Sequence, residues 1–522
     1  MSEHPQADDH AARAGATRSQ LLSNSKWNVL AFLVSLAANF VTIPFVVNAI
    51  GMADFGSAGL VLAALAPLML IGTVLGQAAL REVSHRFAAG DMPGAQRIFS
   101  SALTLCTLAS AAVLVIVALF GGSLVRLFGV DGAAVLTWHL NLVVATIGWL
   151  AQQLVLVLQS TVAATQKYAS MAVISVVATS VNAAVIMIGV VVVPTGLGYL
   201  AGTTVGFVAA LLIWGVLVHR RFPWLFPLSG AGRPETRALL AFGKWQGAGH
   251  LIGAVGIQMD RYVLGALTSF AVVGQYNVAM RLQEVMQMAV LKAGEVLFPH
   301  FSVTATDSIE RRAAFFVSAS WILNTVAACV LVPLIPLSED ILALWLHDPQ
   351  ATGAAPILRT LVAAGVIGCG VNVFSYFAMG TGQPAMLAKV TAAYSVLTIV
   401  LTALLIHQFG ARGAGVGALI AGILRLWLVL LYSRRSFDGL LSVSRVVVCT
   451  LSPLIAGLLV SWLWYRTDLV SPHTWPLLGL SYTLIAVTVA LASLALTCIS
   501  AAGRTLVLDT LRAARSIVLR RA

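Results

Sequence analysis

Charged side chains inside apolar stretches are the residues of this chain whose types and spacing could do chemistry. The densest group lies in residues 242–300, a region predicted to form two apolar helices joined by a short loop. The group consists of Asp260, Arg261, Arg281, Glu284, Lys292 and Glu295, with Lys244 at the entrance. A charge near the middle of a bilayer costs about 2.5–3.5 kcal/mol on insertion scales. A hairpin that carries several such charges is therefore predicted to use them.

The charges of the second helix share one face. At 100° per residue, Asn277, Arg281, Glu284, Lys292 and Glu295 fall within about 80° of one another. From Arg281 to Glu295 this stripe rises roughly 21 Å at 1.5 Å per residue, most of a ~30 Å hydrocarbon core. A stripe of that length cannot reach a single membrane surface. It predicts a polar interior, either a water-filled cavity or partner groups.

A structural interpretation of the stripe stays open beside the functional one. Arg281 with Glu284, and Lys292 with Glu295, are i,i+3 pairs that could neutralise each other and stabilise the helix bundle. On the preceding helix, Asp260 lies about 100° from a neighbouring polar face. That face is made by Gln246, His250 and Arg261.

Three further polar residues lie in other apolar stretches. Asn28 and Asn39 share a face of the first stretch, and Arg425 lies in the middle of residues 412–433. Uncharged amides suit the hydroxyls of a sugar, and they equally suit a hydrogen bond to a neighbouring helix. Both interpretations stay open, and Arg425 is a further candidate for a polar cavity.

Composition places these residues in a membrane protein. The chain is 59% hydrophobic and only 10% charged, with a mean hydropathy of +0.93, which excludes an ordinary soluble domain. The net charge of +12 does not indicate nucleic acid, because the basic residues are spread over many short loops. The five cysteines lie far apart in apolar segments, so neither a disulfide nor a metal site is expected.

Apolar segments of about 20 residues each span a bilayer as a helix. We expect an all-α polytopic membrane protein with about fourteen such spans. Both termini are predicted to be cytosolic, because most Lys and Arg then fall on the inner side. The expected spans are residues 27–48, 57–80, 98–120, 135–159, 168–193, 197–218, 242–267, 274–298, 313–337, 356–379, 384–406, 412–433, 446–465 and 474–500.

An internal repeat divides the chain. A shift of 218 residues places Lys26-Trp27 on Lys244-Trp245, which predicts two parallel, pseudo-symmetric six-helix lobes around a cavity. The same shift places neutral residues of 57–80 on the four charged positions of the stripe. The fold itself therefore does not require those charges. The expected domains are a disordered cytosolic tail at 1–22, lobes at 23–221 and 242–435, a cytosolic linker at 222–241, two additional transmembrane helices within 446–500, and a basic amphipathic tail at 503–522.

Several short segments together carry a family resemblance. They are Asn28, Asn39 and Pro44 of the first span, IGMADFGSAGL (50–60), MDRYVLG (259–265), GQYNVAMRL (274–282) and VLFPHFS (296–302). As a set, they resemble the Wzx-like polysaccharide transporter flippases of the multidrug/oligosaccharidyl-lipid/polysaccharide exporter (MOP) superfamily. The resemblance covers about residues 20–435. The pair of helices beyond that range departs from the twelve helices of many members, whereas lipid II flippases of the same superfamily have fourteen.

The resemblance implies a function without enzymatic chemistry. Such flippases export undecaprenyl-diphosphate-linked oligosaccharides across the bacterial inner membrane by alternating access, for O-antigen, capsule or exopolysaccharide. The implied partners are this substrate, membrane lipids, and the polymerase and chain-length machinery, for a chain expected to be monomeric. Under this hypothesis Arg261, Arg281, Lys292 and Arg425 contact the diphosphate or an anionic sugar, Asp260, Glu284 and Glu295 couple ions or tune charge, and Asn28, Asn39, Gln246, His250 and Asn277 line the cavity.

Three alternative functions require features that the sequence provides less well. A lipid II-type flippase is the second hypothesis, and a drug/cation antiporter needs a more acidic cavity than these residues provide. A membrane glycan polymerase or ligase needs a large outer catalytic loop, whereas the longest outer loops expected here, 121–134 and 338–355, are short. We find no nucleotide-binding, nucleophile or metal-ligand pattern, and no cofactor is expected. Neither the glycan nor the coupling ion can be read from the sequence.

Overall fold

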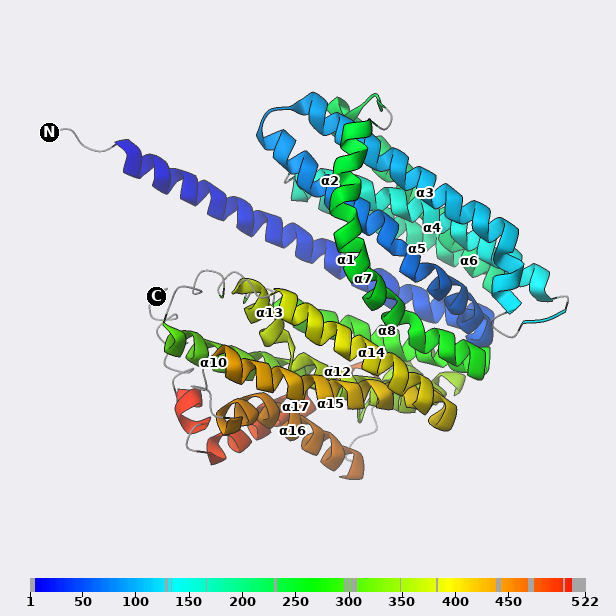
Figure 1. The fold of residues 1–522 in the computed structure, drawn as a ribbon. Coiled ribbons are helices and arrows are strands. Elements are labelled where there is room, and N and C mark those ends of the chain that lie inside the picture. Colours follow the sequence, from blue (N-terminus) through cyan, green and yellow to red (C-terminus); the bar gives the residue numbers. More distant parts are fainter. Residues whose placement is uncertain are drawn as a thin grey trace. The chain divides into compact units, whose positions relative to one another are not determined.

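Every regular element in the described part of the chain is a helix (Figure 1). A bilayer favours this outcome, because a helix satisfies each backbone N–H and C=O within its own segment. The computed structural model describes residues 5–126, 130–132, 134–165, 167–229, 232–294, 297, 301, 308–347, 349–381, 384–437, 443–467, 474–500 and 503–508. Within these ranges, the side chains of 5–30, 168, 242–257, 349–351, 384–385, 388, 434–435 and 443–450 are not described.

The chain divides into two compact units, residues 1–254 and 255–522. The helices of the first unit are α1 (Pro5–Leu65), α2 (Leu70–Ala88), α3 (Met92–Arg126), α4 (Ala134–Ala164), α5 (Tyr168–Val192) and α6 (Gly196–Arg221), and α7 (Arg233–Leu267) crosses into the second. Within the first unit, α4 packs against α2, α3 and α6, and α5 packs against α1 and α6. The core lies along α4, where the fully buried Gln153 accepts a 2.9 Å hydrogen bond from the Gly72 N–H.

The second unit repeats the packing of the first. Its helices are α8 (Phe270–Gly294), α10 (Ile309–Leu331), α11 (Ser338–Leu346), α12 (Ala355–Cys369), α13 (Asn372–Gly380), α14 (Pro384–Phe409), α15 (Ala411–Ser436), α16 (Val443–Thr467) and α17 (Trp475–Ile499). Here α12 packs against α8, α10 and α15, and α14 packs against α15. The packing of α12 matches that of α4 in the first unit, and the packing of α14 against α15 matches that of α5 against α6. The two units are thus built on a common helix arrangement.

The last two long helices of the second unit have no counterpart in the first unit. Both α16 and α17 pack on α10, and they also pack on each other. The Trp321 indole of α10 donates a 2.9 Å hydrogen bond to the Thr497 hydroxyl of α17, which lies 2.8 Å from the Ser452 hydroxyl of α16. All three side chains are buried, so this polar junction helps to join the extra pair to the bundle.

Ten described stretches are long and apolar enough to cross a membrane. The first of them, Ala31–Ala88, contains two expected spans, because α1 continues past a kink at Gly51 (φ 78°). Pro67 interrupts the helix as a short 3₁₀ turn, Ala66–Met69. The charged helix α8 is not among the ten, since its charges lower its hydropathy. An all-helical membrane protein is confirmed, and the number fourteen stays a prediction.

Three details of the expected organisation need correction. The segment 1–22 was expected to be disordered, but α1 begins at Pro5, because its Ala-rich sequence favours helix. The expected span 356–379 is broken between α12 and α13 at 370–371. The expected loop 338–355 contains the helix α11.

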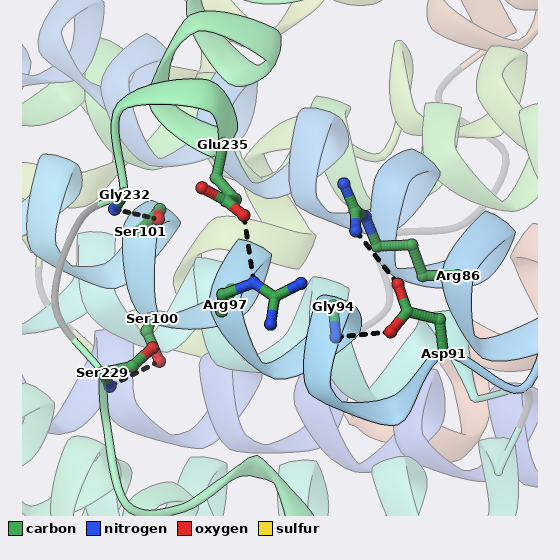
Figure 2. Close-up of polar contacts among 9 residues, drawn as sticks. All are labelled: Arg86, Asp91, Gly94, Arg97, Ser100, Ser101, Ser229, Gly232 and Glu235. Carbon is green, nitrogen blue, oxygen red and sulfur yellow. Dashed lines mark hydrogen bonds and ion pairs between the residues drawn. The ribbon is translucent and has the colours of Figure 1, made fainter.

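The expected linker 222–241 contacts α3, and its last part belongs to α7 (Figure 2). The N–H groups of Ser229 and Gly232 donate to the hydroxyls of Ser100 and Ser101, at 3.2 and 3.1 Å. Glu235, with a side chain only 7% exposed, forms a 3.1 Å ion pair with Arg97.

A neighbouring contact at this end of α3 is independent of the linker. Asp91 accepts a 2.9 Å hydrogen bond from the Gly94 N–H and forms a 3.1 Å ion pair with Arg86. The Gly94 hydrogen bond, and then Arg86, lower the pKa of Asp91 below its usual value. Two ion pairs of equal length therefore lie on one helix end, and only the Arg97 pair holds the linker.

This difference predicts the behaviour of Arg97→Ala. Loss of a partly exposed ion pair lowers the free energy of local unfolding of the linker by about 1 kcal/mol. The fraction of molecules with an open linker then rises about five-fold. We expect trypsin to cleave the purified variant about five-fold faster after the exposed Arg221. Arg86→Ala removes the other pair and is the matched control, with cleavage near the wild-type rate. Equal acceleration in both variants would contradict the assignment.

The junction of the extra pair predicts the effect of Gly457→Leu. A Cβ built at Gly457 lies 2.7 Å from Val332 Cγ2, so a larger residue separates α16 from the end of α10. Overpacking of this kind costs about 1–3 kcal/mol, which should lower the thermal unfolding temperature in detergent. Gly479→Leu on α17, with nothing within 4 Å of its Cβ, is the control and should leave that temperature nearly unchanged.

Candidate functional site

The end of α7 and the start of α8 bring the candidate residues together. Asp260 is 9% exposed and accepts a 2.6 Å hydrogen bond from the hydroxyl of Tyr276, which is fully buried. Thr402 of α14 and the adjacent Arg261 are the other polar groups near this carboxyl. A buried carboxyl needs such partners, because its transfer from water is otherwise costly. The pair links the two helices of the hairpin across 16 residues of sequence.

Arg261 forms hydrogen bonds with other residues than Asp260 does. Its Nε donates a 2.8 Å hydrogen bond to the Asn277 side-chain oxygen, and its Nη1 donates to Gln258. Two uncharged oxygens therefore position the guanidinium. A guanidinium whose hydrogen bonds go to neutral oxygens is suited to an anionic ligand.

The stripe on α8 combines an ion pair with exposed positions. Arg281 and Glu284 lie 3.5 Å apart with side chains 43% and 38% exposed. Further along the same face, Met288 and Lys292 are exposed. The opposite side of α8 is buried, as at Val290. The bundle thus covers the apolar side of α8 and leaves the polar stripe accessible.

The expected pairing along the stripe is found where it can be examined. Arg281 and Glu284 form the i,i+3 pair that the structural interpretation requires, and a pair this exposed stabilises a helix by only about 0.2–0.5 kcal/mol. Glu295, the expected partner of Lys292, lies outside the described residues. The side chains of Asn28, Gln246 and His250 also lie outside them.

Two predicted residues lie apart from the hairpin. The guanidinium of Arg425 on α15 lies 4.7 Å from the centre of the Tyr394 ring on α14, a cation–π contact, and its Nε is buried with no hydrogen-bond partner among the described residues. Asn39 lines a cavity of about 100 Å³ between α1, α5 and α6, and its amide donates 2.8 Å to the Ser35 carbonyl.

Sequence reasoning missed the aromatic and amide partners of the charges. Tyr276 lies directly before Asn277 in the quoted segment GQYNVAMRL, and Gln258 lies directly before MDRYVLG. Their neutral side chains do not stand out in a search for charge. A search for hydrogen-bond donors near the buried Asp260 would have found Tyr276. Among the described residues, no cluster of three or more His, Cys, Asp or Glu could hold a metal ion.

Comparison with known proteins places this geometry in a family and a fold. The family profile described as polysaccharide biosynthesis protein matches residues 21–305. No curated protein sequence matches the chain.

Solved structures of transporters share the fold at low sequence identity. An inward-facing multidrug resistance MATE family transporter of the MOP superfamily aligns with a TM-score of 0.67 and 16% identity, over 78% of this chain and 98% of that one. The lipid II flippase MurJ, in an inward closed conformation, aligns at 0.68 and 15%, over 88% and 97%. A MOP superfamily transporter from Pyrococcus furiosus, whose described binding pocket has reverse polarity, aligns at 0.58 and 15%, over 80% and 96%. The chain is a multi-pass membrane protein with this transporter fold.

The Asp260–Tyr276 contact predicts the effect of Tyr276→Phe. Removing the hydroxyl leaves the buried carboxyl without its donor, at a cost of about 1–3 kcal/mol. We expect a lower thermal unfolding temperature in nanodiscs, and a smaller further loss when Asp260→Asn is added, because the two residues interact directly. Tyr394→Phe keeps an aromatic ring under Arg425 and serves as the control for loss of a hydroxyl. Additive losses in the double variant would contradict the interaction.

Proposed function

The chain belongs to the polysaccharide biosynthesis protein family, and on that premise we propose that it is a flippase for lipid-linked oligosaccharides. It translocates undecaprenyl-diphosphate-linked units across the bacterial inner membrane by alternating access. The product is a surface polysaccharide, and a polymerase with its chain-length machinery receives the flipped unit. The chain acts as a transporter and not as an enzyme.

The observation that carries this proposal is the accessible stripe of α8. Arg281 and Glu284 are each more than one third exposed, and Lys292 is exposed further along the helix. Such charges facing hydrocarbon would cost several kcal/mol, so the stripe must face water or a polar substrate. A diphosphate with attached sugars is a polar headgroup that such a stripe could conduct through the membrane.

Each charged group takes a role that its contacts allow. Arg261, positioned by Asn277, binds the diphosphate, and Arg281, Lys292 and Arg425 provide further positive charge for phosphate or anionic sugars. The carboxylates Asp260, Glu284 and Glu295 tune this charge or couple transport to an ion. The amides of Asn28, Asn39 and Gln246, together with His250, line the path for sugar hydroxyls.

The proposed flippase has a defined membrane topology. Fourteen spans with both termini in the cytosol form two six-helix lobes, within residues 23–221 and 242–435, with an additional pair within 446–500. The repeated packing of α8, α10, α12 and α15 supports this arrangement. A basic tail at 503–522 follows, of which 503–508 is helical.

A lipid II-type flippase is the second candidate. The observation that favours it is the extra pair α16–α17, packed on α10, together with the 88% of this chain that aligns with MurJ. Both candidates move a headgroup carrying a diphosphate, and they differ in the glycan. A drug/cation antiporter is less favoured, because the named cations outnumber the named carboxylates.

Gene deletion with complementation tests the proposed function. A deletion strain should lose surface polysaccharide and accumulate the finished lipid-linked unit on the inner leaflet, measured by glycan and lipid-intermediate analysis. Arg281→Ala with Lys292→Ala should restore less than one tenth of the wild-type polysaccharide, since loss of charged contacts costs about 1.5–3 kcal/mol each.

The controls separate transport from folding and charge. Lys389→Ala removes an exposed cation of the same unit outside the stripe and should complement fully at equal membrane abundance. Full complementation by the double variant would show that the stripe has a structural role and is not needed for transport. If the deletion strain keeps normal surface polysaccharide and becomes sensitive to drugs, the protein is a drug/cation antiporter and not a flippase.

A further inference from the structure

Asp260 and Arg261 are consecutive residues of opposite charge, and each is bound to a different residue of α8. The Tyr276 hydroxyl donates a 2.6 Å hydrogen bond to Asp260 Oδ2, and Arg261 Nε donates a 2.8 Å hydrogen bond to the Asn277 side-chain oxygen. No ion pair joins these two described residues to each other. Opposite charges within a membrane span normally pair, because the low dielectric strengthens their attraction. Their separate partners therefore need an explanation.

The surroundings of the Asp260 carboxyl suit it both with and without a proton. Its Oδ1 is buried and accepts no hydrogen bond from the described residues. The Thr402 hydroxyl of α14 lies near the carboxyl, and its oxygen is likewise buried without a hydrogen-bond partner among those residues. A hydroxyl both donates and accepts, so Thr402 can accept from a protonated Oδ1 or donate to an ionised one. The carboxyl thus has a polar neighbour in either form.

The Arg261 guanidinium has a nitrogen to offer to an anion. Its two hydrogen bonds, from Nε to Asn277 and from Nη1 to Gln258, go to neutral oxygens. The residue is half-buried, and its Nη2 makes no hydrogen bond with the described residues. Phosphate oxygens accept hydrogen bonds from guanidinium N–H groups. The charge of Arg261 acts on the Asp260 carboxyl, so a negative charge bound to Arg261 must act on that carboxyl too.

We propose that Asp260 takes up one proton from water when Arg261 binds a phosphate anion. An ionised Asp260 repels the anion and competes with it for the guanidinium. The proton forms an O–H bond at Asp260 Oδ1, directed at the Thr402 oxygen, and it returns to water when the anion leaves. Protonation removes the competitor and leaves Arg261 on its neutral partners, with Nη2 open to phosphate. The inference rests on the proposed function, since it specifies how the proposed diphosphate contact is regulated.

The groups around Asp260 leave Arg261 as its principal charged neighbour. The side chains that act on the carboxyl are Arg261 on α7, Tyr276 on α8 and Thr402 on α14. The nearest other charged or titratable groups on α8, on α14 and on the helices packed against α8 make no hydrogen bond or ion pair with Asp260. They are Arg281, Glu284, Arg359, Tyr394, His407 and Arg425. The ionisation of Asp260 is therefore expected to follow the charge held at Arg261.

Calorimetric titration of the purified full chain in nanodiscs tests the proposal. The probe is a diester, farnesyl diphosphate joined to N-acetylglucosamine, whose two phosphates keep a constant charge over the pH range used. Titration in two buffers with different ionisation enthalpies measures the protons taken up per bound probe. We expect uptake that approaches about one proton, and an affinity that rises by up to about ten-fold per unit of falling pH between about pH 9 and pH 6.

Two variants and a matched control locate the proton and the anion. Asp260→Asn keeps the shape of the side chain without a titratable group, and it should bind the probe with no proton uptake and with little dependence on pH. Arg261→Gln should weaken binding about ten-fold or more at every pH, because a contact to a charged group is lost. Glu339→Gln is the control, since Glu339 is a 59% exposed carboxylate of the same unit, 2.8 Å from Arg359. It should keep the proton uptake of the wild type.

Three results would overturn the inference: no binding of the probe, binding without proton uptake by the wild-type protein, or uptake that persists in Asp260→Asn. The wild-type titration decides the second point even if Asp260→Asn does not fold. Loss of surface polysaccharide on gene deletion, together with probe binding that takes up no proton, would keep the flippase and reject the role of Asp260. Proton-linked binding together with normal surface polysaccharide after deletion would keep this inference and reject the proposed function.

Discussion

The low dielectric of the bilayer is the constraint on which the rest of this structure depends. It makes every described element a helix, because backbone groups must be satisfied within their own segment. It also favours contacts in which a buried polar side chain meets a partner from another helix. Asp260 is met by Tyr276, Gln153 by the Gly72 N–H, and Trp321 by Thr497. These contacts lie where helices meet, so polar pairing specifies which helices pack together.

Against that background, the two units use one packing scheme for different chemistry. The first unit encloses neutral cavities lined by amides and hydroxyls, as around Asn182. The second unit carries charged residues of the candidate site, with Arg261 held by Asn277 and a charged face on α8. A lipid-linked glycan has the same division, since its diphosphate is charged and its sugar rings need not be. A duplicated scaffold can acquire such specialisation, because the packing residues and the charged residues lie on different faces of a helix, as on α8.

The helices α16 and α17 and the segment after α6 are bound to the rest of their units by polar contacts. The extra pair meets α10 through the Trp321–Thr497–Ser452 junction and through close approach at Gly457. The segment after α6 is attached to α3 by backbone hydrogen bonds to Ser100 and Ser101. In both places, small residues or hydroxyls let one segment approach another closely.

The sequence by itself determined the class of the protein, the helical nature of its apolar segments and the charged face of α8, because hydropathy and the 3.6-residue period are properties of single segments. It also indicated the internal repeat, and the similar packing of α4 and α12 agrees with it. Only the tertiary structure decided that Tyr276 meets Asp260, that α16 and α17 lie on α10, and that Ser229, Gly232 and Glu235 contact α3. It alone revealed that Asp260 and Arg261 have separate partners on α8. These features depend on contacts between residues far apart in the chain, and no local pattern of residue types specifies which distant segments will meet.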